Sequence, residues 1–232
     1  MVTGATRGIG RAIAEMLAAH GCSVVVAARH EEDCHAVADQ ITKSGKGKAL
    51  GIAADVRRFE DCQRIIDAAV SSFGGVDILV NNAGIGGFSA VEKMEVAHWD
   101  RVIATNLSSL FYCSHAALPH LKQRGGWIIN IGSLAGTNAF PGGAAYNASK
   151  FGLIGFSEAL MQEVRHDNVR VSYIMPGSVA TDFEGSSPGA ADWMIQPQDI
   201  GQIVIDLLET PARTLPSRVE VRPAKPPRKN QA

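Results

Sequence analysis

The sequence predicts an α/β fold, a single doubly wound domain in which a parallel sheet of about seven strands carries helices on both faces. Short apolar runs alternate along the chain with longer segments in which apolar residues recur at helical spacing. Parallel strands that are buried on both faces read as such continuous apolar runs, and each needs a crossover to reach its neighbour. The 232 residues suffice for one sizeable core and are short for two. We therefore expect one domain over residues 1–223.

The elements of the first half alternate from the N-terminus. A short apolar start and a glycine-rich loop lead into the helical pattern of Ile13, Met16 and Leu17. The run Val24-Val25-Val26-Ala27-Ala28 predicts the second strand, and Ile78-Leu79-Val80 predicts the fourth. The expected strands lie near 1–3, 22–28, 48–54 and 77–81. The expected helices lie near 9–20, 31–44 and 58–73.

The second half continues the alternation. Trp127-Ile128-Ile129-Asn130-Ile131 and the run from Val169 to Met175 predict two more strands, and Ser217 to Pro223 predicts a short last one. These strands lie near 126–132, 169–175 and 218–222. The helices lie near 97–123, 145–166 and 197–209. Residues 224–232 are rich in proline and basic side chains, so we expect a disordered tail, with a proline-rich docking peptide as the alternative.

A glycine-rich loop at residues 3–10 is the first functional signal. It reads Thr3-Gly4-Ala5-Thr6-Arg7-Gly8-Ile9-Gly10, a Gly-x-x-x-Gly-x-Gly spacing that differs from Gly-x-Gly-x-x-Gly. Glycines let the backbone turn tightly and approach a pyrophosphate, whose charge the helix N-terminus favours. A lone glycine loop is often only a turn. The apolar run that follows the next helix makes this one part of a strand–loop–helix–strand nucleotide unit.

Tyr146 and Lys150 carry the strongest chemical signal. They stand four residues apart at the start of a long amphipathic run, so they share one face of a helix. A lysine ammonium beside a phenol favours the phenolate, which lowers the tyrosine pKa below its reference of about 10. Such a tyrosine can donate or accept a proton near neutral pH. In isolation the same spacing also fits an exposed helical pair with no function. The surrounding motifs therefore have to show whether the pair belongs to a site.

Three further motifs follow predicted strands. Asn81-Asn82-Ala83-Gly84 follows one, Ser133 follows another, and Pro176-Gly177 with Thr181 follows a third. Open α/β sheets bind ligands outside the carboxyl ends of their strands. Ser133 alone fits a turn serine, and Thr181 alone fits a loop hydroxyl. Together with the glycine loop and the Tyr–Lys pair, these motifs predict one site at one edge of the sheet.

At this point the chain resembles the short-chain dehydrogenase/reductase family, and within it an NADP-preferring subclass similar to 3-oxoacyl reductases. The resemblance runs from Thr3 to about Leu208 and implies a Rossmann-type fold. It rests on residues 3–10, Asp55, residues 81–84, the helix asparagine Asn106, Ser133, the Tyr–Lys pair and the Pro-Gly turn. The resemblance implies four catalytic positions, namely Asn106, Ser133, Tyr146 and Lys150. It implies cofactor contacts at Thr3, Gly4, Thr6, Arg7, Gly8, Ile9, Gly10, Arg29, Asp55, Val56, Asn82, Ala83, Gly84, Tyr146, Lys150, Pro176, Gly177, Val179 and Thr181.

The resemblance also implies a mechanism. Ser133 would donate a hydrogen bond to a substrate carbonyl oxygen, and Tyr146 would give that oxygen its proton. Lys150 would lower the tyrosine pKa and bond the nicotinamide ribose. Asn106 would hold a water that links Lys150 to solvent; alone, this asparagine fits a capping or kink residue. The family usually has a longer first strand than Met1-Val2-Thr3, so we expect that the recorded chain starts late and that stability is affected more than chemistry.

The cofactor is expected to be NADP(H). An NAD-preferring site generally places an acid at the end of the second strand, where it accepts from the ribose 2′-hydroxyl. Here that strand ends at Ala28-Arg29, and the nearest acids, Glu31 and Glu32, begin the next helix. The Arg29 guanidinium suits a 2′-phosphate, and we expect Arg7 to approach the same phosphate. The alternative is that Arg29 only stacks on adenine.

The substrate is less constrained. Asp182 to Gln196 would cover the site as a mobile lid that contains Phe183, Trp193 and Met194. Phe88 and Phe140 would line the pocket or belong to the core. These side chains favour an apolar or amphipathic carbonyl compound, such as a 3-oxoacyl thioester or a small ketone. We therefore expect a carbonyl reductase, with a secondary-alcohol dehydrogenase or a non-catalytic nucleotide-binding sensor as alternatives.

Composition excludes several other classes. A net charge of −1 gives no reason to expect nucleic acid or an anionic membrane as partner, and no run reaches the roughly 18 apolar residues of a membrane span. No signal peptide is visible. The cysteines have no Cys-x-x-Cys spacing, so we expect reduced thiols in the cytoplasm. We expect no metal, since His30, Cys34 and His35 lack a fourth ligand.

The family resemblance and two long apolar helices imply a homotetramer or homodimer.

Overall fold

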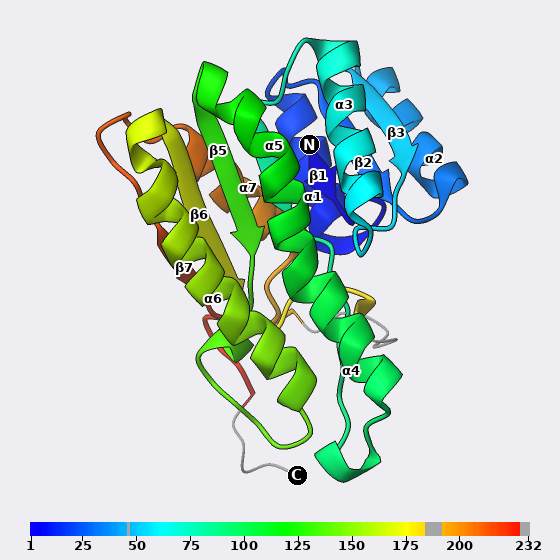
Figure 1. Cartoon of the computed structure of the whole chain (residues 1–232), viewed down its shortest axis with the longest axis vertical. Helices are drawn as coiled ribbons and strands as arrows, with labels where there is room; N and C mark the ends of the chain where they lie inside the picture. Colours follow the sequence, from blue (N-terminus) through cyan, green and yellow to red (C-terminus); the bar gives the residue numbers. More distant parts are fainter. Residues whose placement is uncertain (46, 184–191, 228–232) are drawn as a thin grey trace.

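The fold is built on one parallel sheet. The structure is a computed structural model that describes residues 1–45, 47–183 and 192–227. The sheet has seven strands in the order β3-β2-β1-β4-β5-β6-β7, and every pairing between neighbours is parallel (Figure 1). The strands are β1 Val2–Thr3, β2 Val24–Ala28, β3 Ala49–Ala53, β4 Ile78–Asn81, β5 Gly126–Ile131, β6 Val169–Pro176 and β7 Arg218–Val221. The predicted α/β class, the parallel sheet and its strand number are confirmed.

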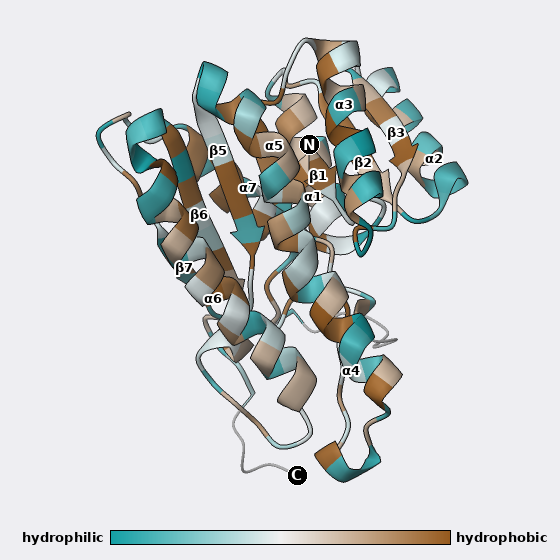
Figure 2. Ribbon diagram, in the orientation of Figure 1, coloured by the Kyte–Doolittle hydropathy of each residue, from teal (hydrophilic) through white to brown (hydrophobic). Residues whose placement is uncertain are grey.

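Helices cover both faces of this sheet. The α-helices are α1 Gly8–Ala19, α2 Glu31–Lys43, α3 Phe59–Phe73, α4 Val96–Ile103, α5 Ser109–Arg124, α6 Ala144–Val164 and α7 Pro197–Leu208. Helices α1, α2 and α7 pack on one face around Ile13, Val37 and Ile200. Helices α3, α5 and α6 pack on the other around Ile65, Leu121 and Leu160. Figure 2 shows hydrophobic residues along the strands between these two layers, as expected for strands buried on both faces.

The first strand is short but central. Its two residues lie between β2 and β4, in register with Val26, Ala27 and Val80. Val2 is fully buried. The glycine loop therefore leaves the middle of the sheet, where the strand order changes direction, and doubly wound folds bind ligands at this switch point.

One predicted helix is wrong in detail. The sequence predicted a continuous helix at 97–123, whereas the structure has α4, a π-helical segment η2 at Ala104–Ser108, and then α5. A π-helical turn accommodates an extra residue and often marks a functional position. Here it contains Asn106, whose side chain is buried.

The predicted last strand is confirmed. Strand β7 pairs with β6 from Tyr173 to Pro176. Residues 224–227 are exposed and belong to no helix or strand. The rest of the predicted disordered tail, residues 228–232, lies outside the described residues. Among the described helices, none has the length and apolar character that crossing a bilayer requires.

Candidate active site

A large cleft runs along the carboxyl edge of the sheet. Its volume is about 1110 Å³, and its walls come from the glycine loop, the ends of β2 to β6, the N-terminal half of α6 and one side of α4. All strands are parallel, so the segments that follow them emerge at one edge (Figure 1). The five motifs that the sequence singled out therefore meet at this cleft.

The glycine loop and the Asn81–Gly84 segment are locked together. Thr3 Oγ1 accepts hydrogen bonds from the backbone N–H groups of Asn82 (3.0 Å) and Ala83 (3.1 Å). The Asn82 side chain donates to the carbonyls of Thr3 (2.9 Å) and Gly4 (3.1 Å). A Cβ on Gly10 would lie 2.3 Å from both Asn82 Nδ2 and the Gly4 oxygen, so only glycine fits there. These contacts explain Thr3 and Gly10 as supports of the loop.

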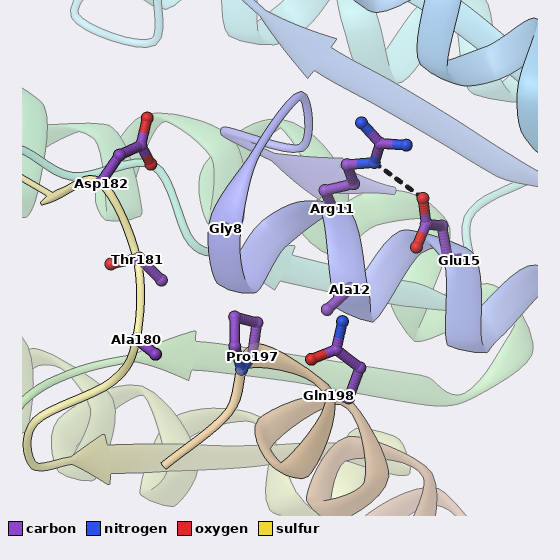
Figure 3. Close-up of a pocket in the computed structure, with 9 residues that line it drawn as sticks. All are labelled: Gly8, Arg11, Ala12, Glu15, Ala180, Thr181, Asp182, Pro197 and Gln198. Atoms are coloured by element: carbon purple, nitrogen blue, oxygen red, sulfur yellow. Dashed lines mark hydrogen bonds and ion pairs between the residues drawn. The ribbon is translucent and has the colours of Figure 1, made fainter. Parts of the chain in front are cut away.

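The loop has the backbone that a phosphate-binding turn needs. Gly4 and Gly8 have φ of 63° and 53°, in the left-handed region that favours glycine. The loop ends at the N-terminus of α1, a 12-residue helix whose first N–H groups can bind an anion. Figure 3 shows Gly8 at the start of α1, opposite Thr181. The Thr181 side chain lies 3.2 Å from where a Gly8 Cβ would be, so the loop after β6 closes over the glycine loop.

Tyr146 and Lys150 lie on the first turns of α6 and both line the cleft. Lys150 Nζ is 5.7 Å from the centre of the Tyr146 ring and donates to the Ile131 carbonyl at 3.0 Å. Its side chain is buried, and this loss of solvation lowers the pKa of Lys150 to about 8. The predicted shared face is confirmed, and the ammonium lies near the phenol.

Ser133 follows β5 and also lines the cleft. It precedes the 3₁₀ turn η3 at Leu134–Gly136, and its Oγ accepts a hydrogen bond from Ala135 N at 3.1 Å. That bond fixes the side chain at the start of the turn. The hydroxyl keeps its own proton as a donor for a ligand.

Asn106 lies behind the cleft wall. Its Oδ1 accepts from Ile85 N (2.8 Å), and its Nδ2 donates to Ile85 O (2.8 Å) and to Ser149 Oγ (3.1 Å). A Cβ built on Gly84 would lie 3.5 Å from Asn106 Oδ1 and 4.0 Å from Lys150 Nζ, so both side chains approach Gly84 from behind. Asn106 thus ties the loop after β4 to α6.

The far end of the cleft lies past β2 and β3. Arg29 is exposed there, and Asp55 and Val56 follow the neighbouring strand. Arg57, which the sequence reading did not single out, also lines the cleft and pairs with Asp55. Arg7 lines the cleft as expected, but its Nη1 donates to Asp182 Oδ2 at 2.6 Å. Arg7 therefore already has a carboxylate partner from the loop after β6.

Two aromatic rings lie beside the Tyr146 ring. Phe88 is 5.4 Å and Phe183 is 6.0 Å from the Tyr146 ring, centre to centre, and Phe140 is 5.8 Å from Phe88. Phe88 and Phe140 are 49% and 42% exposed, so neither belongs to the core, and of the two only Phe88 lines the cleft. Phe183 and Met194 line the cleft. Residues 184–191 of the predicted lid lie outside the described residues.

Nearly all predicted site residues face this cleft. Thr3, Gly10 and Asn106 lie directly behind its wall instead. The cleft also contains residues that the sequence reading missed, namely Arg57, His98, Arg101 and Thr105. The last three recur at helical spacing before Asn106, which could have indicated one helix face turned to the site. A smaller groove of about 420 Å³ lies between α1 and α7, beyond Thr181 (Figure 3).

Comparison with known proteins decides the family. A family model described as short chain dehydrogenase matches residues 1–190. This chain belongs to the short-chain dehydrogenase/reductase family. It is therefore an NAD(P)-dependent oxidoreductase, as the sequence predicted.

Relatives in this family include reductases and dehydrogenases. The chain is 43% identical to the 3-oxoacyl-(acyl-carrier-protein) reductase FabG of Escherichia coli over 184 residues. This match covers 79% of this chain and 74% of the relative. It is 40% identical over 186 residues to trans-4-hydroxycyclohexanecarboxylate dehydrogenase of Sinomonas cyclohexanicum, covering 78% and 72%. An alcohol dehydrogenase from Thermococcus sibiricus, solved with 5-hydroxy-NADP, superposes with a TM-score of 0.92 at 28% identity, covering 98% and 97%.

Proposed function

We propose that the protein is an NADP(H)-dependent reductase that converts a carbonyl into a secondary alcohol. The observation that carries this proposal is Tyr146 beside buried Lys150 and in the same cleft as Ser133. A binding module or scaffold would have no chemical need for this proton-transfer set, which argues against the sensor alternative.

The cleft fits a dinucleotide. Left-handed Gly4 and Gly8 would let the backbone and the α1 N-terminus approach a pyrophosphate, and a Cβ at Gly4 would meet the Ala83 backbone at 2.9 Å. Asp55, Val56 and residues 82–84 would hold the adenosine end, and residues 176–181 the nicotinamide end. When bound, NADP(H) supplies or accepts the hydride; the protein supplies position and electrostatics.

Side chains of the protein carry out the proton transfer. Ser133 Oγ donates to the substrate oxygen where negative charge develops, and Tyr146 gives that oxygen its proton. The Lys150 ammonium stabilises the resulting phenolate and would hold the nicotinamide ribose. Asn106, joined to Ile85 and Ser149, holds the loop beside Lys150. We propose that it also supports a water that links Lys150 to solvent for proton resupply. In the oxidation direction the phenolate acts as the base.

Preference for NADP(H) rests mainly on Arg29. The acid that would favour a 2′-hydroxyl is missing from the end of β2, and Arg29 lines the cleft there. A charge-assisted contact contributes about 1.5–3 kcal/mol before solvent screening, so we expect at least about a tenfold preference. Arg7 would add to this if it exchanged Asp182 for phosphate. The 5-hydroxy-NADP in the Thermococcus sibiricus structure supports the same choice.

The substrate end favours an apolar carbonyl compound. Phe88, Phe183 and Met194 give the wall near Tyr146 an apolar character. A 3-oxoacyl thioester fits the FabG relative, and a small ring ketone fits the cyclohexanecarboxylate relative. The second relative and the alcohol dehydrogenase keep the oxidative direction open as the second candidate function.

The same proposal includes assembly and location. Phe111 on α5 and Phe151 on α6 are 52% and 47% exposed, which suits pairing with a second copy. All four cysteines are free, which suits the reducing cytoplasm. We therefore propose a cytoplasmic homotetramer or homodimer.

The test is NADPH consumption against a panel of 3-oxoacyl thioesters, acyclic ketones and ring ketones, with NADH in parallel. Ala28→Asp is the matched variant, because a carboxylate at the end of β2 repels a 2′-phosphate. The native enzyme should favour NADPH by kcat/KM, and Ala28→Asp should shift the preference toward NADH. Turnover of no carbonyl with either cofactor would reject the reductase.

A further inference from the structure

Arg57 and Asp55 form an ion pair inside the cofactor cleft. Arg57 Nε lies 2.9 and 3.0 Å from the two Asp55 carboxylate oxygens, and Nη2 also donates to Oδ2. The Arg57 backbone N–H donates to Asp55 Oδ1 at 3.0 Å. One guanidinium therefore holds both oxygens of Asp55 in a fixed orientation.

The pair lies at the same end of the cleft as Arg29, the residue proposed to bind the 2′-phosphate. Strands β2 and β3 end side by side, with Ala28 paired to Ala53 and with Ala54 N donating to the Ala28 carbonyl at 2.7 Å. Arg29 follows the first strand end, and Asp55 follows the second. Hydrogen bonds from Arg57 lower the pKa of the Asp55 carboxyl below its usual range, and the charge of Arg29 acts in the same direction. Arg29 and Asp55 therefore lie just past neighbouring strand ends and line the same part of the cleft.

At this end of the cleft, Arg57 supplies the positive charge that makes the number of basic side chains equal to the number of acidic ones. The side chains past β2 and β3 that line it include two guanidinium groups and two carboxylates, namely Arg29, Arg57, Asp33 and Asp55. Without Arg57, the carboxylates of Asp33 and Asp55 would outweigh Arg29. A phosphate approaching Arg29 would then meet net negative charge.

The geometry points to Arg57 as a specificity-determining residue: by neutralising and orienting Asp55, it lets the adenosine end of the cleft accept a 2′-phosphate. This inference rests on the proposed use of NADP(H). Arg57 acts through Asp55, so it is a positioning residue. Arg29 remains the direct partner of the phosphate.

Binding of two adenosine ligands separates this role from a purely structural one. Adenosine 2′,5′-bisphosphate carries the 2′-phosphate, and 5′-AMP lacks it; calorimetry on the full chain measures both without turnover. Arg57→Ser should weaken the bisphosphate at least about fivefold more than it weakens 5′-AMP, because a bare carboxylate repels the added phosphate. Arg57→Lys keeps the charge but loses the fork, so its loss should be intermediate.

A double variant that removes both charges of the pair gives a more specific test. Asp55→Asn combined with Arg57→Ser removes both charges and should return the ratio of the two affinities to within about twofold of the native value. Arg58→Ser is the control, because Arg58 is the next residue, is exposed and is absent from the cleft lining. It should leave the ratio unchanged.

The failures are distinguishable. A native protein that binds both ligands equally overturns the NADP(H) proposal and this inference with it. A native preference that survives Arg57→Ser, or that the double variant fails to restore after Arg57→Ser has lost it, overturns the inference alone. Equal weakening of both ligands by Arg57→Ser also overturns it, because that pattern describes loss of local structure.

Discussion

At the scale of single residues, burial determines the pKa of Lys150. The side chain is 6% exposed, and desolvation lowers its pKa to about 8. Sequence spacing predicted that Lys150 would share a helix face with Tyr146. It could not predict the depth of burial, which depends on how α6 packs near Ile131 at the end of β5.

The lowered pKa predicts a pH dependence. Lys150 is charged below about pH 8 and neutral above it, so support for the Tyr146 phenolate is present at lower pH and is lost as pH rises through that value. We expect kcat/KM for carbonyl reduction to fall above about pH 8, since this parameter reports the free enzyme. Lys150→Arg, which stays charged, should move this fall to higher pH whatever its absolute rate. A native profile that is flat to about pH 10 would contradict the role of Lys150.

At the scale of elements, the π-helical segment between α4 and α5 positions Asn106. Its side chain makes three hydrogen bonds, two to the Ile85 backbone and one to Ser149. Asn106→Ala leaves the Ile85 groups without this partner, which should lower the free energy of unfolding by about 1–3 kcal/mol. It should also reduce kcat, because the loop beside Lys150 loses its tie.

Ser149→Ala is the matched comparison. It removes only one of the three bonds to Asn106, so its effect on unfolding by urea and on kcat should be smaller. If the two variants behave alike, Ile85 does not depend on Asn106.

The strands could be predicted from the sequence, whereas the π-helical turn and two ion pairs could not. Apolar runs located the strands of the sheet interior, because strands buried on both faces are predominantly apolar, whereas β7 alternates between exposed and half-buried residues. The turn at Ala104–Ser108 was missed, because its apolar spacing continues that of the flanking helices. The Arg7–Asp182 pair was missed as well: its partners are 175 residues apart in sequence, and only the closed loop after β6 brings them together. Arg57 was missed because an arginine two residues after an aspartate is unremarkable until the loop orients both.

At the scale of the whole molecule, the layer of α3, α5 and α6 leaves large apolar side chains outside. Phe111 and Phe151 lie on α5 and α6, which pack on the same face of the sheet (Figure 1). We expect light scattering at micromolar concentration to give at least twice the mass of one chain. Phe111→Glu with Phe151→Glu should shift the mass toward a single chain, because burying two carboxylates opposes association. A single-chain mass for the native protein would reject the assembly proposal.

The arrangement of the whole sheet supports the central claim that Tyr146 is the proton donor of a carbonyl reductase. Seven parallel strands bring the glycine loop, Ser133 and the Tyr–Lys pair to one edge, and the rings of Phe88 and Phe183 lie beside the Tyr146 ring. The Tyr146→Phe variant removes one hydroxyl and keeps the ring contacts with Phe88 and Phe183.

The most direct test therefore compares native and Tyr146→Phe protein with NADPH and the best substrate from the carbonyl panel, and measures kcat together with the Kd for NADPH. We expect kcat to fall at least about 100-fold, the lower range for loss of an acid–base group, while the Kd changes little. Near-native turnover by Tyr146→Phe would contradict the account.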